Sequence, residues 1–338
     1  MPWLLILEFL GCSALIVFAG IKLSRYGDVI AEKLGLGRAW VGLVLMASIT
    51  SLPELINGIS SVTIADVPDI AVGDIMGSSI FNIAIIAAMD FFHRPGPVFA
   101  SAYPGHVLSA GFGIVLIGIA CISVLVSDQI PAIGTIGLYT PVILAVYFIG
   151  IRSIYYFEKR RIAEIAGEIT KATIYDDVPL NKAVKLYALN AGIIILSATA
   201  LPFIGEALAD ATGLGKSFVG TFFIGITTSL PEVVVSLACI RIGATDMAIA
   251  NLFGSNMFNI CILAVDDILY TKGPLLSAVS KNHAVSGFTA MVITGMAVVA
   301  LTYRIKSKTF LRLGWDAIAI LATFFASIAL LYALRGSG

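Results

Sequence analysis

Charged side chains are scarce in this sequence. Only 12% of its 338 residues are Asp, Glu, Lys or Arg, whereas 59% are hydrophobic, and the mean hydropathy is +0.99. A typical soluble domain carries about 25% charged residues. Apolar stretches of about 20 residues, the length that crosses a bilayer as a helix, recur along the chain. The composition therefore predicts a polytopic protein embedded in the lipid bilayer, and no nucleic-acid partner is expected.

Cysteine and histidine are also rare. The four cysteines, Cys12, Cys121, Cys239 and Cys261, stand in apolar stretches without paired spacing, so neither a disulfide framework nor a zinc site is expected. The three histidines, His93, His106 and His283, fall near the ends of predicted spans, where an interfacial role is expected. No basic segment precedes the first apolar run. We therefore expect residues 3–23 to be a first spanning helix and not a cleaved signal peptide.

Ten spanning helices can be drawn from the apolar runs. Their predicted ranges are 3–23, 38–63, 68–91, 104–126, 129–151, 184–206, 217–240, 245–266, 283–303 and 314–334. Most connections are short, but residues 152–183 form a long one. Within it, residues 157–165 alternate charge with an apolar face. This pattern predicts an amphipathic helix at the membrane surface, with a solvated linker as the alternative.

Basic residues are distributed unequally between the two sides of this arrangement. One side receives 17 of the 21 Lys and Arg residues, including seven between Arg152 and Lys185, and the other side receives 4. Loops rich in Lys and Arg stay in the cytoplasm. The sequence therefore predicts a multi-pass cell-membrane protein with both termini extracellular and the 152–183 loop cytoplasmic.

Two polar motifs occur twice in the same order. Residues 50–54 and 228–232 both read Thr-Ser-Leu-Pro-Glu, while 77–82 (Gly-Ser-Ser-Ile-Phe-Asn) are echoed by 254–259 (Gly-Ser-Asn-Met-Phe-Asn). The spacing between copies is 178 residues for the first motif and 177 for the second. Five spans precede the long loop and five follow it, so the two halves enter the membrane in opposite directions, a pattern typical of transporters.

These repeats define the expected domain organisation. The fold class is predicted to be all-α, with ten transmembrane helices as two inverted five-helix repeats and broken helices at the midplane. The predicted parts are a first half at 1–151 with its repeat at about 42–91, a cytoplasmic linker at 152–183, and a second half at 184–338 with its repeat at about 219–266.

The repeated motifs carry the ligand types of a cation site. Pro53 is expected to break its helix and free the carbonyls near Thr50 and Ser51, and Glu54 adds a carboxylate. Ser78 and Asn82 share one helical face, and Gly77 is expected to let two helices approach closely; the second half repeats this set. Hard oxygen donors of this kind suit Ca²⁺, and also Na⁺. The plain alternative is a proline kink with a Glu tied to a neighbouring helix.

The paired motifs resemble the repeats of the cation/calcium exchanger superfamily, and the Na⁺/Ca²⁺ exchanger branch in its compact prokaryotic form most closely. The resemblance implies a secondary antiporter that exchanges Na⁺ for Ca²⁺ by alternating access, normally extruding Ca²⁺, with no cofactor, no enzymatic activity and no protein partner. Carried over by motif, the implied ion ligands are Thr50, Ser51, Glu54, Ser78, Asn82, Thr228, Ser229, Glu232, Ser255 and Asn259.

Several alternatives stay open. Proton-coupled calcium exchangers resemble this chain but show Gly-Asn-x-x-Glu in place of Thr-Ser-Leu-Pro-Glu, so the motif favours sodium coupling over an H⁺/Ca²⁺ exchanger. Asn259 stands where potassium-dependent relatives have an acid. An intramembrane hydrolase, suggested by Gly73-Asp74, lacks a second well-placed Asp, and a channel would hold Ca²⁺ too tightly at two carboxylates.

Four acidic residues outside the motifs need an assignment. Asp74 is either a ligand in an ion path or an acid at a helix start. Asp90, Asp266 and Asp267 close predicted spans and are expected to be boundary residues.

Overall fold

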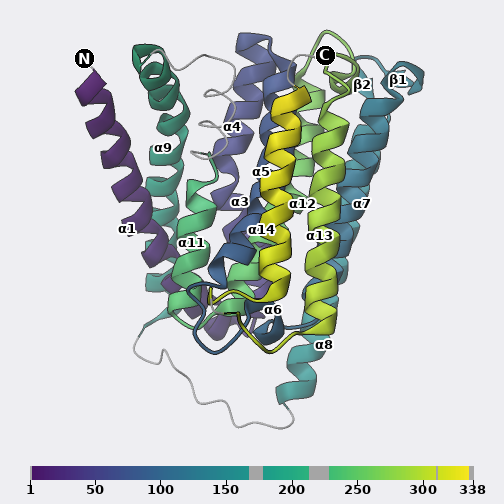
Figure 1. Ribbon diagram of the computed structural model, residues 1–338. Coiled ribbons are helices and arrows are strands. Elements are labelled where there is room, and N and C mark those ends of the chain that lie inside the picture. The colour runs from purple at the N-terminus through teal and green to yellow at the C-terminus, as the bar shows by residue number, and fades with distance from the viewer. Residues whose placement is uncertain (1, 167–177, 213–227, 310, 335–338) are drawn as a thin grey trace.

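A computed structural model describes every residue of the chain except 1, 167–177, 213–227, 310 and 335–338. The described residues form a bundle of long helices (Figure 1). In the first half the α-helices are α1 (Pro2–Leu34), α2 (Arg38–Trp40), α3 (Ala47–Thr50), α4 (Leu52–Ser60), α5 (Pro68–Met89), α6 (Val98–Ser101), α7 (His106–Leu125) and α8 (Tyr139–Ala166). In the second half they are α9 (Leu180–Thr212), α11 (Leu230–Arg241), α12 (Thr245–Leu269), α13 (His283–Tyr303) and α14 (Trp315–Leu334).

Shorter elements join these helices. Two π-helical turns belong to the segment that contains α2, α3 and α4. The turn η1 (Val41–Met46) joins α2 to α3, and η2 (Ser61–Ala65) continues α4 at its C-terminal end. A 3-10 turn (Ser127–Gln129) and the antiparallel strands β1 (Ala132–Ile133) and β2 (Ile136–Gly137) join α7 to α8. A further 3-10 turn, Leu275–Ser277, lies between α12 and α13.

The end of α1 shows how local sequence sets a helix boundary. The apolar run predicted a span at 3–23, but the helix continues to Leu34. It stops at Gly35, whose φ of +63° suits glycine because this left-handed conformation crowds a Cβ atom. The Leu36 N–H donates to the Ala31 carbonyl (2.9 Å) and the Gly35 N–H to that of Glu32 (3.2 Å). This pair of hydrogen bonds is the Schellman arrangement that closes many helices.

Predicted spans and observed helices differ most at residues 129–151. The helix there, α8, begins only at Tyr139, because Pro131 and Gly134 (φ +66°) turn the chain through the β1–β2 hairpin. The charged segment 157–165, predicted as a separate surface helix, forms the last turns of α8. The part of the predicted span 217–240 before residue 228 lies outside the described residues, as do 167–177 of the linker. The boundaries of the two halves therefore stay predictions.

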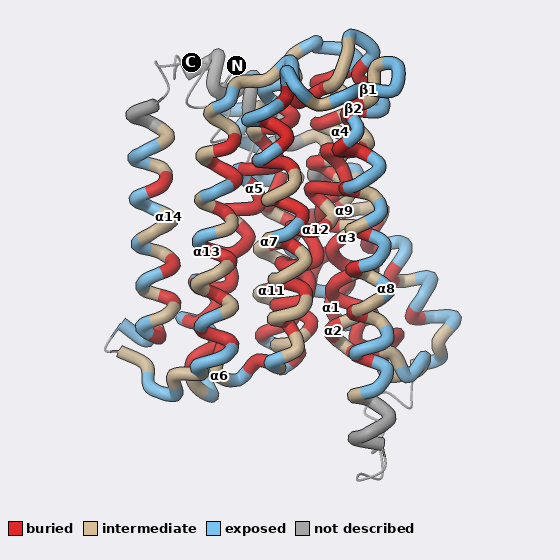
Figure 2. Tube along the Cα trace, turned by 90° about the vertical axis from the view of Figure 1, so that its right-hand side faces the viewer, coloured by how far each residue is buried: buried red, intermediate tan, exposed pale blue. Residues whose placement is uncertain are grey.

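Seven of the described helical segments are long and apolar enough to cross a membrane. They are Trp3–Leu34, Arg38–Ala65, Pro68–Met89, His106–Leu125, Tyr139–Arg161, Thr245–Leu269 and His283–Tyr303, and a shorter apolar helix covers Trp315–Leu331. Large apolar side chains such as Phe18, Leu196 and Val299 are exposed on the outside, whereas many polar side chains are buried (Figure 2). Such an inside-out distribution is expected when lipid is the solvent. The prediction of a multi-pass membrane protein is confirmed.

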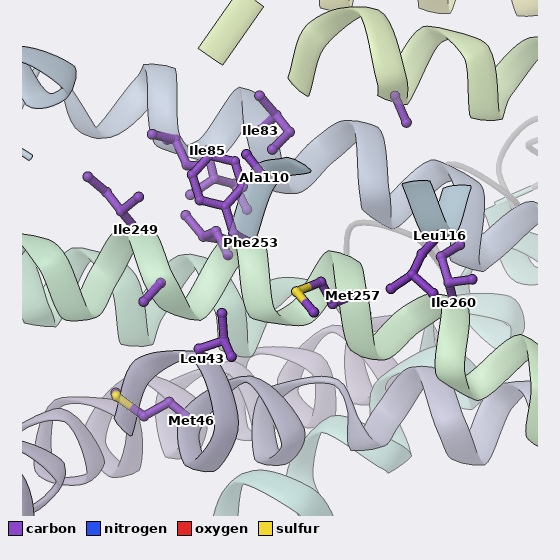
Figure 3. Packing of buried hydrophobic residues seen from close by; sticks show 14 of the residues in the cluster. Leu43, Met46, Ile83, Ile85, Ala110, Leu116, Ile249, Phe253, Met257 and Ile260 are labelled. Atoms are coloured by element: carbon purple, nitrogen blue, oxygen red, sulfur yellow. The ribbon is translucent and has the colours of Figure 1, made fainter. Parts of the chain in front are cut away.

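Helix α12 lies at the centre of the bundle, where it contacts η1, α3, α5, α7, α8 and α11. Figure 3 shows Phe253 of α12 pointing toward Ile85 and Ala110, which belong to α5 and α7. On another side, a Cβ atom built on Gly254 would clash with the backbone of Leu43. Glycine is therefore needed at 254, because it lets α12 approach the segment that leads to the first repeated motif.

The predicted close approach at Gly77 stays a prediction, because the segment expected to face it is not among the described residues. No atom of the described residues lies within 4 Å of a Cβ atom built on Gly77. In the repeat pattern the segment opposite Gly77 would be near residue 221, outside the described residues.

The chain ends and the hairpin share one end of the bundle. Helix α1 begins and α14 ends at the top of Figure 1, where β1 and β2 also lie, while the last turns of α8 project from the opposite end. Helix α1 packs along α9 and against α11 at one side of the molecule. The site described next lies in the rest of the bundle, around α4, α5, α11 and α12.

Candidate cation-binding site

A helix begins directly after the serine of each Thr-Ser-Leu-Pro-Glu segment. Ser51, with φ −90° and ψ 9°, separates α3 from α4, and Ser229, with φ −81° and ψ 3°, directly precedes α11. Each proline falls in the first turn of the helix that follows, where its missing N–H breaks no helical hydrogen bond. Glu54 and Glu232 consequently stand in the first turn of a helix and are 1% and 0% exposed.

The carbonyl groups of the two serines are used within the helices that follow, so the prediction of freed carbonyls near Thr50 and Ser51 does not hold for Ser51. The Ser51 carbonyl accepts a hydrogen bond from the Leu55 N–H (3.2 Å), and the Ser229 carbonyl accepts one from the Val233 N–H (3.2 Å). The new helix starts immediately after the break, so it uses these acceptors at once. The serines therefore offer the site their hydroxyls.

The two serine hydroxyls cross between the halves. Ser51 Oγ donates to Oε1 of Glu232 (3.0 Å), and Ser229 Oγ donates to Oε1 of Glu54 (3.4 Å). A Ser-x-x-Glu segment at a helix start usually forms a local capping box, but neither serine caps its own helix. Each carboxylate is thus held by the opposite repeat.

Helices α5 and α12 supply a second hydroxyl to each carboxylate. Ser78 Oγ donates to Oε1 of Glu54 (3.4 Å), and Ser255 Oγ donates to Oε1 of Glu232 (3.3 Å). Ser78 also lies 3.2 Å from Ser229. The predicted serines of both motifs therefore converge on the two glutamates, in two nearly equivalent arrangements.

Asp74 belongs to this cluster. Its Oδ1 accepts hydrogen bonds from Thr228 (3.3 Å) and Ser78 (3.5 Å), and its Oδ2 accepts one from Asn57 Nδ2 (2.7 Å). Asp74 therefore lies beside the predicted ion ligands Ser78 and Thr228, within α5 and not at its start.

The repeat equivalent of Asp74 is Asn251. Its Oδ1 lies 3.5 Å from Thr50 Oγ1, and its Nδ2 donates to Ser236 Oγ (3.1 Å). Sequence reasoning missed Asn57 and Ser236. In the sequence, only their spacing could have indicated them: Asn57 follows Glu54 by three residues and Ser236 follows Glu232 by four, so each shares a helical face with its glutamate.

The two asparagines of the second motif behave differently. Asn82 Nδ2 donates to Oδ1 of Asn256 (2.9 Å), whose own Nδ2 donates to the Ser79 carbonyl (3.0 Å), so this amide pair joins α5 to α12. The amide of Asn259 is fully buried and has no hydrogen-bond partner among the described residues. Asn256 was not among the predicted ligands, although it follows Ser255 directly.

Four buried oxygen atoms of predicted ligands lack a hydrogen-bond donor within the described structure. They are Glu54 Oε2, Glu232 Oε2, Asn82 Oδ1 and Asn259 Oδ1. A buried carboxylate without a partner is destabilising unless a proton or a cation neutralises it. Oxygen atoms of carboxylate and amide groups are the ligands that Ca²⁺ prefers. The arrangement is therefore suited to bind a hard cation.

The side chains around the two glutamates are mostly hydroxyl and amide groups. Among the described residues, no three His, Cys, Asp or Glu side chains come together as a metal cluster. The two glutamates are instead supplemented by hydroxyl and amide groups.

Asp90 and Asp267 are boundary residues, as predicted. Asp90 accepts hydrogen bonds from the N–H groups of Val98 (2.7 Å) and Gly314 (2.5 Å). Asp267, 177 residues later, accepts them from the N–H groups of Gly137 (3.0 Å) and Leu275 (2.7 Å). Each acid fastens two loops at one end of the bundle. Asp266, by contrast, accepts no hydrogen bond from a loop within the described residues.

Comparisons with known proteins agree with this arrangement. The profile of the family described as sodium/calcium exchanger protein matches residues 4–157 and 183–333. Inner membrane protein YrbG of Escherichia coli (strain K12) is 26% identical over 327 residues, which cover 94% of this chain and 94% of that protein. Sodium/calcium exchanger MaX1 of Methanosarcina acetivorans is 27% identical over 133 residues, 38% of this chain and 35% of that protein.

A solved structure of the sodium-calcium exchanger NCX_Mj superimposes with a TM-score of 0.74 at 18% identity, covering 97% of this chain and 99% of that one. This likeness confirms the predicted fold class of ten helices in two inverted repeats. Both the family and the fold are those of a membrane transporter. The match of the family profile to most of the sequence shows that this chain belongs to the sodium/calcium exchanger protein family.

Proposed function

We propose that the protein is a secondary antiporter that exchanges Na⁺ for Ca²⁺ by alternating access and normally extrudes Ca²⁺. The observation that carries the proposal is the set of unpartnered oxygens on Glu54, Glu232, Asn82 and Asn259, all in the buried interior. Two carboxylates balance the charge of one Ca²⁺ ion. Further support comes from two similar proteins, MaX1 and NCX_Mj, which are named as sodium/calcium exchangers.

Each predicted ligand has a role in this proposal. Glu54 and Glu232 share the central ion. The hydroxyl-bearing and amide residues hold the flanking ions or orient the glutamates; these are Thr50, Ser51, Ser78, Asn82, Thr228, Ser229, Ser255 and Asn259. Na⁺ and Ca²⁺ compete for overlapping oxygens, so occupation by one ion excludes the other, and this competition couples the two fluxes.

We also propose an orientation. The end of the bundle with the start of α1 and the end of α14 faces outward, and the end from which α8 projects faces the cytoplasm (Figure 1). The reason is the distribution of basic residues, 17 on the second side and 4 on the first. The 152–183 linker would then be cytoplasmic.

Ion coupling is tested by Ca²⁺ uptake into proteoliposomes containing the purified protein. An outward Na⁺ gradient is expected to drive uptake, whereas an imposed pH gradient without Na⁺ is not. Uptake driven only by the pH gradient would replace sodium coupling with the H⁺/Ca²⁺ alternative. Liposomes without protein provide the background.

The site itself is tested by Glu54→Gln and Glu232→Gln. Each substitution removes one of the two buried negative charges while keeping the shape of the side chain, so Na⁺-driven Ca²⁺ uptake is expected to fall to background. Asp128→Asn, at an exposed acid that pairs with Lys281, is the matched control and should transport normally. Full activity in either glutamine variant would remove the proposed site.

A further inference from the structure

Asp266 is a buried acid without a structural partner. It lies in the last turns of α12, it is 0% exposed, and neither of its carboxylate oxygens accepts a hydrogen bond within the described residues. An ionised carboxylate in such surroundings needs a compensating positive charge.

The adjacent acid, Asp267, has a structural role. Asp267 accepts hydrogen bonds from Tyr139 and Thr140 in addition to the N–H groups of Gly137 and Leu275. Both of its oxygens are therefore fully used. Asp266 stands one residue earlier and makes none of these contacts, so loop fastening does not explain it.

The internal repeat provides a second comparison. The residue that corresponds to Asp266 in the first half is Met89, which is also fully buried, and the residue that corresponds to Asp74 is Asn251. The same fold therefore accepts an apolar and a neutral side chain at these two positions. The acidic pair is confined to one side of the central site, which indicates a role in ion handling and not in folding.

Asp74 and Asp266 flank the same turn of α4. A Cβ atom built on Gly58 would clash with both carboxylate oxygens of Asp266, so the acid faces the α4 backbone at this glycine. The preceding residue, Asn57, donates its Nδ2 to Asp74 (2.7 Å). Asp74 and Asp266 therefore contact adjacent residues of α4, so a cation near this turn would be attracted by both carboxylates.

The location of this pair is asymmetric along the bundle. Asp266 adjoins Asp267, which fastens the β1–β2 end, and Asp74 contacts Ser78, which in turn contacts Glu54. The two acids therefore lie between the central glutamates and the end of the molecule that carries both chain ends (Figure 1).

We propose that Asp266, Asp74 and Asn57 form a second cation site, whose hard oxygen ligands bind Ca²⁺. The ion would occupy this site on its way to the central site from this end of the molecule. The inference rests on the proposed antiport, since it places this second site on the path of the transported ion. Glycine at position 58 leaves room for the Asp266 carboxylate, which a side chain there would displace. Two carboxylates and an amide are suitable ligands for Ca²⁺.

The first experiment measures whether a cation binds at Asp266. Dicyclohexylcarbodiimide, which modifies carboxyl groups in apolar surroundings, is applied to purified full-length protein, and modification at Asp266 is quantified by peptide mass spectrometry. The Glu54→Gln/Glu232→Gln double variant lacks the central charges, so protection there reports the second site alone. We expect Ca²⁺ to reduce modification of Asp266, and Asp74→Asn to raise the Ca²⁺ concentration needed by about tenfold.

Choline chloride at equal ionic strength is the control and should not protect. Glu232→Gln alone serves if the double variant does not fold. Modification of Asp266 that is unaffected by Ca²⁺ in these backgrounds would overturn the proposal.

The second experiment measures transport in proteoliposomes. Asp266→Asn is expected to raise the KM for Ca²⁺ on the side of the chain ends by about tenfold while kcat is retained, because the central site is intact. Asp128→Asn is expected to leave both values unchanged. An unchanged KM in Asp266→Asn would contradict a role in the ion path. If the wild-type protein fails to exchange Na⁺ for Ca²⁺ while Ca²⁺ still protects Asp266, the proposed function is wrong and the cation site stands.

Discussion

The serine hydroxyls give the two halves of the protein a reciprocal relation at the scale of single residues. Ser51 contacts Glu232 and Ser229 contacts Glu54, so each helix break serves the carboxylate of the other repeat. The motif alone did not reveal this crossing, because Ser-x-x-Glu is compatible with a local capping box. Which glutamate a serine meets depends on the packing of the two halves.

Pairs of serine substitutions test this crossing. Ser51→Ala with Ser255→Ala removes the two serine hydroxyls from Glu232, whereas Ser51→Ala with Ser78→Ala removes one serine hydroxyl from each glutamate. Each single change is expected to weaken Ca²⁺ binding by about 1.5 kcal/mol, since the acceptor is charged. The first pair should be non-additive and the second additive. The opposite result in Ca²⁺-binding calorimetry would mean that the serines serve their own repeats.

Asn259 is a buried position at which a further acid would change the charge of the site. Its amide is buried and unpartnered, so Asn259→Asp adds a charge without breaking a hydrogen bond. We expect tighter Ca²⁺ binding at alkaline pH and stronger proton competition at acidic pH, measured as the KM for Ca²⁺ at both. The control is Asn256→Asp, which breaks the amide contacts with Asn82 and Ser79 and should lower stability. A pH profile identical to that of the wild type would show that position 259 does not line the site.

The helices that carry the motifs could be predicted from sequence to a large extent. The repeats at 50–54 and 228–232 located both helix breaks, and the apolar runs located the long helices, because hydrophobicity and proline act locally. The start of α8 was misplaced because the turn at Gly134 lies within an apolar run. Asp266 and Asp267 are adjacent in sequence, and only the loop contacts in three dimensions distinguish them.

The close approach of α12 to η1 gives a prediction at the scale of helices. Gly254→Ala places a methyl group against backbone atoms of Leu43, which cannot rotate away as a side chain can. Overpacking of this kind costs about 1–3 kcal/mol. The melting temperature of the purified protein should fall. Gly295→Ala on α13 is the control, since nothing lies within 4 Å of its Cβ position, and it should melt at or above the wild-type temperature. Equal melting temperatures would show that the interface relaxes freely.

The molecule as a whole consists of a compact part around α12 and the pair α1 and α9 at one side (Figure 1). Neither of these two helices carries a repeated motif. Helix α1 meets α11 of the compact part along a seam. There, Ser24 Oγ donates to the Val235 carbonyl (3.0 Å), and Gly20 lies against Val234. If α1 and α9 slide along this seam during transport, fixing it should stop the cycle.

A disulfide across the seam tests this motion. The Cβ position of Gly20 is 3.5 Å from Cβ of Val234, within the range that a disulfide bridges. Gly20→Cys/Val234→Cys, in a background without the four native cysteines, is expected to bind Ca²⁺ but not transport it when oxidised, and to transport after reduction. Gly20→Cys alone is the control. Transport by the oxidised protein would mean that this seam does not move.

The crossed serines have a thermodynamic consequence for the whole protein. A cation held by Glu54 and Glu232 is bound to both repeats at once, so it acts as a cross-link that exists only while the halves are docked. Saturation at about 100 times the dissociation constant stabilises the docked form by about 2.7 kcal/mol. Removing Ca²⁺ and Na⁺ with a chelator and a choline buffer should therefore lower the melting temperature and speed hydrogen exchange in α4 and α11. The cargo would then be part of what holds its carrier together, and each transport cycle would briefly remove that support.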